Sequence, residues 1–268
     1  MKVRALSALI AVLAVAGTYW FLKTDGLLLI GLVVSAGGIL EYARLSFRKE
    51  SDISSIRWSF VALCFALLLT TTLLDRPIAA IAQVAVYFVT IVLLSVSRRT
   101  DLAPAVQLQG SGLMGFLYVG IFPALALRLL RLENGDIWFF GLLATVFAGD
   151  TLAYITGRFF GKHTLFSAVS PKKTVEGALG GLCGSALAGF VIAQLLPQHT
   201  TPMTMIAAAI VTGGFAQIGD LQESLLKRVA EVKDSGSVMP GHGGILDRID
   251  GVLFAAPVYY SVVSFLIG

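Results

Sequence analysis

The stretch from Met205 to Gly219, MIAAAIVTGGFAQIG, carries no charged side chain, and Asp220 follows it directly. Together with its neighbours it approaches the ~20 residues that cross the hydrocarbon core of a bilayer as a helix. It lacks the alternation of polar and apolar residues that is typical of a strand in a membrane barrel. The stretch therefore predicts a transmembrane helix over 202–222, with an ionisable group at the membrane boundary.

The composition of the whole chain agrees with this interpretation. Of its 268 residues, 56% are hydrophobic and 13% are charged, whereas a soluble domain carries about 25% charged residues. So few charges cannot cover a water-soluble sphere, and we expect lipid to be the solvent for most of the surface. The apolar runs predict an all-α polytopic bundle of about nine spans, at 4–22, 26–44, 57–74, 78–97, 111–130, 137–157, 176–196, 202–222 and 248–267.

The lysines and arginines fall mostly on one side of this bundle. With nine spans, the N-terminus lies on the same side of the membrane as the loops that follow spans two, four, six and eight. That side holds all but four of the 20 basic residues, the four being Lys23, Arg76, Arg128 and Arg131. By the positive-inside rule we expect the N-terminus inside, the C-terminus outside and a multi-pass protein of the cell membrane, in bacteria the inner membrane.

Two other features of the sequence have simple interpretations. Lys2 and Arg4 precede an apolar run, as in a signal peptide, but residues 18–21 make a poor cleavage site, which favours a first span. Cys64 and Cys183 both lie inside predicted spans and indicate neither a disulfide framework nor a metal cluster.

Polar residues are concentrated in the second half of the chain. We expect 1–131 to be a transmembrane scaffold, in which Glu41 lies near a helix end where it can reach water. We expect 132–268 to be the catalytic region, with cytoplasmic loops at 158–175 and 223–250. Gly177, Gly180, Gly181 and Gly184 form two small-xxx-small pairs, which predict close helix packing.

The densest polar segment runs from Asp220 to Asp250. A carboxylate at the edge of a span costs up to about 2.5–3.5 kcal/mol on insertion scales and is a functional candidate. The glycines around His242 allow backbone N–H groups to approach an anion. Asp247 and Asp250 open the last helix, where capping alone would also explain them. Carboxylates beside several cations predict a divalent-metal and polyphosphate site.

The segment from Gly149 to Gly177 carries a second set of polar residues. Asp150 lies inside the sixth span and is too far along the helix from Arg158 for direct contact. Thr174 can cap a helix that begins near Val175. Lys172 and Lys173 then lie at a helix N-terminus, a suitable place for phosphate, although positive-inside lysines would also explain them. The sequence has no Walker A loop, dinucleotide fingerprint or zinc spacing.

These segments resemble a known family. The pattern Ser224-Leu-Leu-Lys227-Arg228-x4-Lys233-Asp234-x-Gly236-x3-Pro240-x-His242-Gly243-Gly244-Ile-x-Asp247-Arg248-Ile-Asp250 is similar to the signature of the phosphatidate cytidylyltransferases (CDP-diacylglycerol synthases). Met239 departs from the family's usual Leu, Ile or Phe and conserves volume. Gly149-Asp150-x2-Ala153-Tyr154-x2-Gly157-Arg158-x2-Gly161-Lys162-His163 and Ser170-Pro-Lys-Lys-Thr-x-Glu176-Gly177 resemble the family's second conserved region.

The resemblance implies transfer of CMP from CTP to phosphatidate, giving CDP-diacylglycerol and pyrophosphate. It implies Mg²⁺, with a monovalent cation such as K⁺ beside it. Asp220 and Asp247 would carry the metal, with Asp150 the next candidate. The implied catalytic residues are Asp220, Asp247, Lys227 and Arg228. The implied CTP- and phosphate-binding residues are Lys172, Lys173, Lys233, His242, Gly243, Gly244 and Arg248. The supporting residues are Ser224, Tyr154, Arg158, Glu223, Asp234 and Asp250.

Alternatives remain open at this point. A CTP-dependent transferase acting on another lipid phosphate or on a polyprenol would use the same residue types. A transporter of an anionic metabolite would show inverted repeats and broken spans in both halves, whereas the polar residues here occupy one half. We expect CTP, phosphatidate and membrane lipid as partners and no nucleic acid. The small-residue faces are compatible with a homodimer as well as with internal packing.

Overall fold

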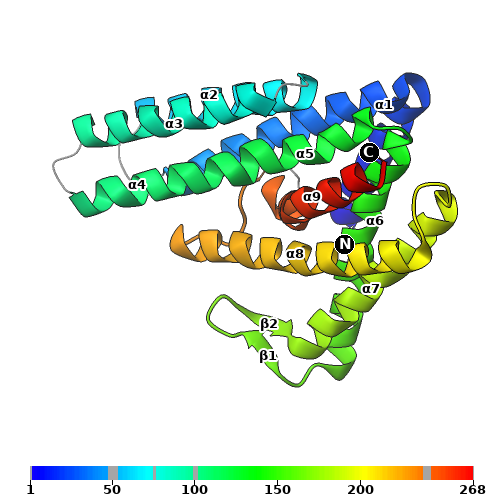
Figure 1. The fold of residues 1–268 in the computed structure, drawn as a ribbon. Coiled ribbons are helices and arrows are strands. Elements are labelled where there is room, and N and C mark those ends of the chain that lie inside the picture. Colours follow the sequence, from blue (N-terminus) through cyan, green and yellow to red (C-terminus); the bar gives the residue numbers. More distant parts are fainter. Residues whose placement is uncertain (1, 48–53, 75–76, 99–101, 238–242, 268) are drawn as a thin grey trace. The chain divides into compact units, whose positions relative to one another are not determined.

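The computed structural model describes residues 2–47, 54–74, 77–98, 102–237 and 243–267 (Figure 1). The chain forms two compact units, and each one combines segments that are far apart in the sequence. The first unit consists of residues 1–128 and 229–247, and the second of residues 129–228 and 248–268.

The first unit contains the helices of the N-terminal half. They are α1 (Lys2–Ser46), α2 (Ser54–Leu73), α3 (Pro77–Arg98), α4 (Leu102–Gly115), the π-helical turn η2 (Phe116–Ile121) and α5 (Phe122–Arg128). Aromatic side chains form much of its core: Tyr87 stacks on Phe116 with ring centroids 4.0 Å apart, and Tyr42 packs against Phe60 at 5.6 Å. These rings come from four different elements, so their burial joins α1, α2, α3 and η2.

The second unit contains the helices α6 (Gly135–Phe160), α7 (Val175–Leu195), α8 (Pro202–Val229) and most of α9 (Leu246–Ile267), with a 3₁₀ turn, η3 (Leu129–Arg131). Helices α6 and α7 pack closely because glycines line their interface. A Cβ atom on Gly177 would lie 2.9 Å from the carbonyl oxygen of Ala153, and one on Gly149 would lie 2.7 Å from Ser185 Oγ. Gly181 and Gly184 also face α6, which confirms the predicted role of these glycines in helix packing.

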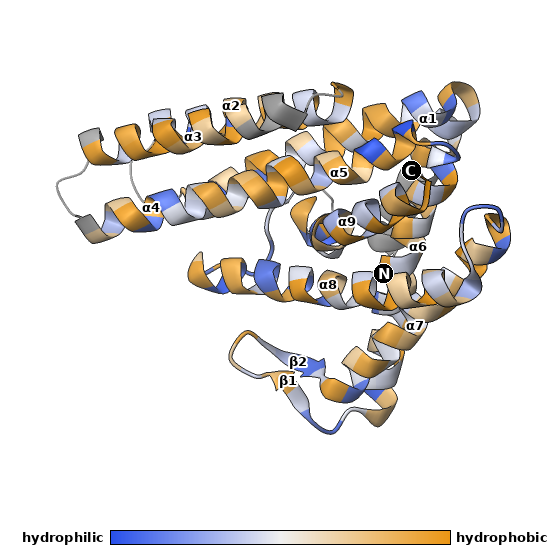
Figure 2. Ribbon diagram, viewed as in Figure 1, coloured by the Kyte–Doolittle hydropathy of each residue, from blue (hydrophilic) through white to orange (hydrophobic). Residues whose placement is uncertain are grey.

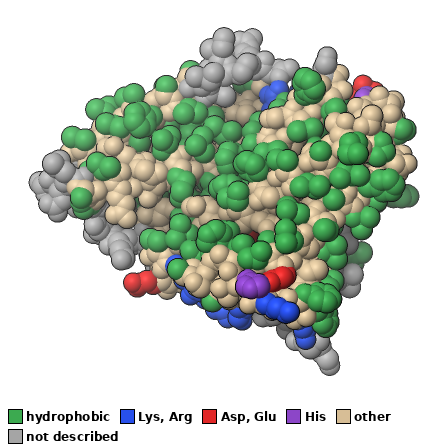
Figure 3. Space-filling model, turned by 60° about the horizontal axis from the view of Figure 1, so that its bottom comes forward, with side chains coloured by type: hydrophobic (Ala, Val, Ile, Leu, Met, Phe, Trp, Pro, Cys, Tyr) green, Lys and Arg blue, Asp and Glu red, His purple; other side chains and the backbone are tan. Residues whose placement is uncertain are grey.

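Within the described residues, seven helices are long and apolar enough to cross a membrane, and Ala82–Val96 of α3 is a shorter apolar helix. Hydrophobic residues dominate these helices in Figure 2 and cover most of the face presented in Figure 3. Large side chains such as Leu179, Phe215 and Phe265 are exposed. The architecture is therefore that of a polytopic α-helical membrane protein. The first two predicted spans both lie in α1, which is interrupted at Lys23 (φ 51°, ψ −134°), between their predicted bounds.

A short β-hairpin interrupts the helical pattern, and the sequence analysis did not predict it. Strand β1 (Thr164–Phe166) pairs antiparallel with β2 (Ser170–Thr174) inside the predicted loop 158–175. The amide of Val175 donates to the carbonyl of His163 at 2.9 Å and closes the hairpin base. As predicted, Thr174 caps α7: its hydroxyl accepts a hydrogen bond from the Gly177 amide at 3.1 Å.

Candidate functional site

A cavity of about 610 Å³ lies within the second unit, bounded by α6, the hairpin, α7 and α8. Its lining combines carboxylates and cations with small and apolar residues: Asp150, Ala153, Tyr154, Gly157, Arg158, Leu165, Lys172, Lys173, Thr174, Gly177, Ala178, Gln217 and Asp220. In this cavity, polar side chains of α6 and of the hairpin therefore meet Gln217 and Asp220 of α8.

Lysine side chains from the hairpin reach the cavity because β2 leads directly into α7. Lys173 Nζ lies 2.5 Å from a carboxylate oxygen of Asp220 on α8. Lys172, the preceding residue on β2, is exposed and also lines the cavity. This placement beside the capped N-terminus of α7 suits a phosphate group, since the helix dipole and both ammonium groups favour negative charge.

Asp150 and Arg158 line the same cavity from α6. Asp150 is exposed to it, and the guanidinium of Arg158 donates to the hydroxyl of Tyr154 at 2.9 Å. Arg158 therefore pairs with Tyr154, one turn away, as the helix geometry requires. Asp150 thus lines the same cavity as Lys173 and Asp220.

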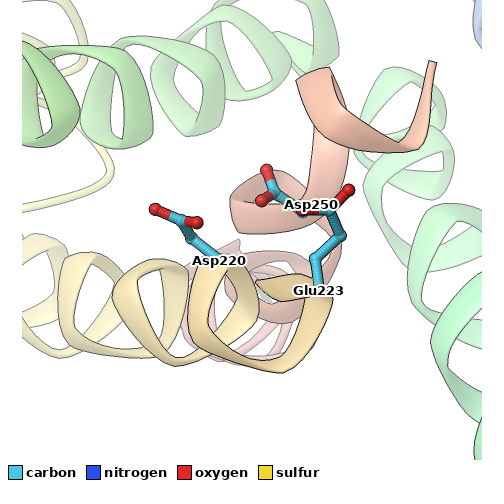
Figure 4. Close-up of side chains that lie close together, drawn as sticks. All are labelled: Asp220, Glu223 and Asp250. Atoms are coloured by element: carbon cyan, nitrogen blue, oxygen red, sulfur yellow. The ribbon is translucent and has the colours of Figure 1, made fainter. Parts of the chain in front are cut away.

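Three carboxylates gather where α8 meets α9 (Figure 4). Asp220 and Glu223 come from α8 and Asp250 comes from α9, and one oxygen of each lies within 4.8 Å of the others. The close approach of the helices depends on Gly219, because a Cβ atom there would lie 2.5 Å from the carbonyl oxygen of Asp250. Oxygen ligands at this spacing fit a hard divalent cation such as Mg²⁺.

The C-terminal end of α8 adds cations to this region. Lys227 forms an ion pair with Glu223, one turn earlier on the same helix. Arg228 Nε donates to the carbonyl of Val169, in the turn of the hairpin, at 3.4 Å. Ser224, one turn earlier on α8, is half-buried. The end of α8 is thus connected to the hairpin that carries Lys172 and Lys173.

Asp247 and its neighbours belong to the first unit. The Asp247 carboxylate accepts hydrogen bonds from the amides of Ser235 (2.9 Å) and Gly244 (2.8 Å). Lys233 and Asp234 are exposed, as is Arg248 at the start of the second unit's last segment. Gly243 has φ +82°, so the positive φ expected of this glycine-rich segment is present there. His242 lies outside the described residues.

The expectation that Glu41 reaches water is wrong. Its residue surface is 1% exposed, and its carboxylate accepts three hydrogen bonds from residues 235–246 of the first unit. The sequence carried a signal for this role, since Glu41 is an acidic residue inside an apolar run, and such residues are functional candidates by default. Gln217, which lines the cavity and donates to the carbonyl of Ala178 at 3.0 Å, was also missed.

The structure thus brings two of the three predicted metal ligands, Asp220 and Asp150, to one cavity and adds two further carboxylates beside Asp220. Asp220 lies beside Glu223 and Asp250, which the sequence analysis placed only in supporting roles. Asp150 shares the cavity with Asp220. Asp247 belongs to the other unit, so its pairing with Asp220 stays a prediction.

Comparisons with known proteins agree with these observations. The model of the cytidylyltransferase family matches residues 2–266. The phosphatidate cytidylyltransferase of Staphylococcus epidermidis strain RP62A is 34% identical over 268 aligned residues, which cover 96% of this chain and 97% of that protein. The phosphatidate cytidylyltransferase of Synechocystis is 40% identical over 58% of this chain and 62% of its own length. That of Bacillus subtilis is 38% identical over 55% of each chain.

Proposed function

We propose, because the chain belongs to the cytidylyltransferase family, that it transfers a cytidylyl group from CTP to phosphatidate, giving CDP-diacylglycerol and pyrophosphate. The observation that carries this proposal is the cavity of the second unit. Within it, Lys173 and Asp220 meet between helices long and apolar enough to cross a membrane. Such a site can hold two phosphorylated substrates, one from water and one from lipid.

The chemistry suits the residue types. A phosphate oxygen of phosphatidate forms a bond to the α-phosphorus of CTP, and the bond from that phosphorus to the oxygen that bridges the α- and β-phosphates breaks, so that pyrophosphate leaves with this oxygen. Because the attacking phosphate is already anionic, the protein must chiefly position two polyanions and neutralise their charge. Lys172 and Lys173 line the cavity wall, and we propose that they bind phosphate groups there. Lys227 and Arg228, at the end of α8, are proposed to neutralise charge on the leaving group.

We propose Mg²⁺ as the cofactor, held by Asp220, Glu223 and Asp250, with Asp150 as a further candidate because it lines the same cavity as Asp220. A bound Mg²⁺ would polarise phosphoryl oxygens and shield the charge between the substrates. Asp247 stays a candidate ligand, and His242, Gly243, Gly244, Lys233 and Arg248 stay candidates for the nucleotide. A monovalent cation such as K⁺ stays a proposal that rests on the family resemblance.

We also propose the topology predicted from the sequence. Nine spans, with the N-terminus inside and the C-terminus outside, would put the hairpin segment 158–175 and the segment 223–250, which includes the end of α8 and the start of α9, on the cytoplasmic side, where CTP is available. The charge distribution of lysine and arginine supports this orientation. The helix faces with small residues are also compatible with packing against a second copy of the chain in a homodimer.

The decisive experiment supplies purified protein in detergent with phosphatidate, α-³²P-labelled CTP and Mg²⁺, and measures labelled CDP-diacylglycerol. Parallel reactions replace phosphatidate with a polyprenol or a polyprenyl phosphate. We expect product from phosphatidate, loss of product with Asp220→Asn, and retention of product with Asp136→Asn. Asp136 is a matched control because it lies in the first turn of α6 and outside the cavity lining. No product from phosphatidate with the wild-type protein would refute the proposal, and product only from a polyprenol would reassign the acceptor.

A further inference from the structure

Glu41, on the second half of α1, is hydrogen-bonded to Ser235, Ile245 and Leu246 of the same unit. Its Oε1 atom accepts a hydrogen bond from the Ile245 amide at 3.0 Å. Its Oε2 atom accepts from the Leu246 amide at 2.8 Å and from the hydroxyl of Ser235 at 2.9 Å. Ile245 and Leu246 provide N–H groups at the start of α9, where a helix has no internal acceptors for them. A buried carboxylate is costly without such partners, so these three contacts account for its presence in an apolar core.

Asp247 completes the same arrangement. Its Oδ2 atom accepts from the Ser235 amide and from the Gly244 amide, and it lies 3.0 Å from the Ser235 hydroxyl, whose single hydrogen can be donated either to Asp247 or to Glu41. Ser235 thus lies between the carboxylates of Glu41 and Asp247, within hydrogen-bonding distance of both. The position of the Asp247 side chain therefore depends on Ser235, and Glu41 in turn holds Ser235 in place.

Glycines allow the chain to close around these carboxylates. A Cβ atom on Gly236 or Gly244 would collide with the carboxylate of Glu41. Gly243 has a positive φ, and a Cβ atom there would lie 2.7 Å from Asp247 Oδ2. Gly37, one turn before Glu41 on α1, leaves space for the side chain of Ile245. The family resemblance implies that Gly243 and Gly244 bind the nucleotide, and the structure shows in addition that Gly244 packs against Glu41.

We propose that Glu41 is a positioning residue of the transferase: it anchors Ser235 and the start of α9, and through them it orients Asp247. This inference rests on the proposed function for its catalytic part. It also gives the N-terminal half of the chain a part in the reaction, beyond that of a scaffold. Glu41 acts through Ser235 and the backbone, so it need not contact a substrate.

The anchoring is tested by amide hydrogen exchange of the full-length protein in detergent, with Glu41→Gln. The amide nitrogen of the new side chain cannot accept a hydrogen bond, so at least one of the three donors loses its acceptor. We expect exchange in peptides covering 244–247 to rise about tenfold, while peptides covering 54–73 of α2 stay unchanged. Ser35→Ala is the matched control, because Ser35 is buried on the same helix and its hydroxyl donates only within α1, to the carbonyl of Gly31 at 2.7 Å.

The catalytic part is tested by kinetics of the same variants. We expect Glu41→Gln to lower kcat about tenfold or more with a smaller change in KM for CTP. Glu41→Asp keeps the charge and should recover part of the lost kcat, whereas Ser35→Ala should match the wild type. Unchanged exchange at 244–247, or an unchanged kcat, in Glu41→Gln would overturn the inference. A general rise of exchange throughout the first unit would also overturn it, because it would indicate a purely structural role. If the wild-type protein makes no CDP-diacylglycerol, the proposed function fails, and the exchange measurement still decides whether Glu41 anchors this segment.

Discussion

Lys173 Nζ lies 2.5 Å from a carboxylate oxygen of Asp220, and this ion pair joins strand β2 of the hairpin to helix α8. The side chains are 26% and 41% exposed, so water and ligands reach both of them. An exposed ion pair contributes only about 0–1 kcal/mol to stability. We therefore infer that a phosphate group can replace Asp220 as the partner of Lys173, and that a cation can replace Lys173 as the partner of Asp220. Neither exchange should lower the stability of the fold by much.

The first prediction concerns this lysine. Lys173→Met removes the ammonium group and keeps most of the side-chain volume. The variant should therefore bind phosphate groups more weakly while its packing stays intact. We expect kcat/KM for CTP to fall at least about tenfold, which corresponds to one charge-assisted hydrogen bond. Thermal stability should stay close to that of the wild type. Lys162→Met is the control, since Lys162 is exposed near the hairpin but outside the cavity lining. Equal kinetics for the two variants would exclude a role of Lys173 in substrate binding.

The second prediction concerns the carboxylates of α8 and α9. If Asp220, Glu223 and Asp250 hold Mg²⁺, then Asp250→Asn removes one charged ligand and leaves the others in place. We expect the Mg²⁺ concentration for half-maximal activity to rise about tenfold, and excess Mg²⁺ to restore much of the rate. Chelation with EDTA should abolish activity of the wild type, and added Mg²⁺ should restore it. Asp136→Asn is the comparison, because Asp136 lies in the first turn of α6 and outside both the cavity lining and the carboxylate cluster. A Mg²⁺ requirement that is the same in both variants would remove Asp250 from the metal site.

Much of the fold could be predicted from the sequence because membrane spans depend on local composition. The apolar runs around 57–74, 137–157 and 176–196 correspond to α2, α6 and α7 with shifts of a few residues. The cap at Thr174 was predictable for the same reason, since it depends on a hydroxyl three residues before an amide. The hairpin was not, because its strands are short and lack the alternation of polar and apolar residues that indicates a strand.

The candidate site was harder to predict because its geometry depends on contacts between distant segments. Asp220 and Glu223 are three residues apart on α8, a spacing that puts two side chains on one face of a helix, but nothing local in the sequence indicates that Asp250 lies beside them. That contact depends on Gly219, whose missing side chain lets α9 approach. Glu41 lies 194 positions before Ser235, and no spacing rule relates the two residues.

The third prediction tests Gly219 directly. A methyl group at this position would collide with the backbone of α9 at Asp250, so Gly219→Ala must separate the two helices. We expect both a lower melting temperature in detergent and a loss of activity, because Asp250 moves away from Asp220. Gly214→Ala is the matched control on α8, since a Cβ atom there has its nearest neighbour at an ordinary 3.9 Å, the Cδ2 atom of Leu182. In that variant, alanine should be neutral or stabilise the helix by about 0.5–1 kcal/mol. Gly219→Ala with wild-type stability and activity would show that the α8–α9 contact is not needed.

The fourth prediction separates the cap of α7 from the rest of the hairpin. Thr174→Ala removes the hydroxyl that accepts the Gly177 amide, which should cost about 1 kcal/mol of stability and loosen the first turn of α7. Because Lys172 and Lys173 immediately precede this turn, we expect KM for CTP to rise as well. Thr174→Ser keeps the hydroxyl and should behave like the wild type in both measurements. Thr174→Val keeps the shape without the hydroxyl and should behave like Thr174→Ala. If the valine variant instead matches the wild type, the contribution of Thr174 lies in its packing against Gly157 and Gly161 rather than in the cap.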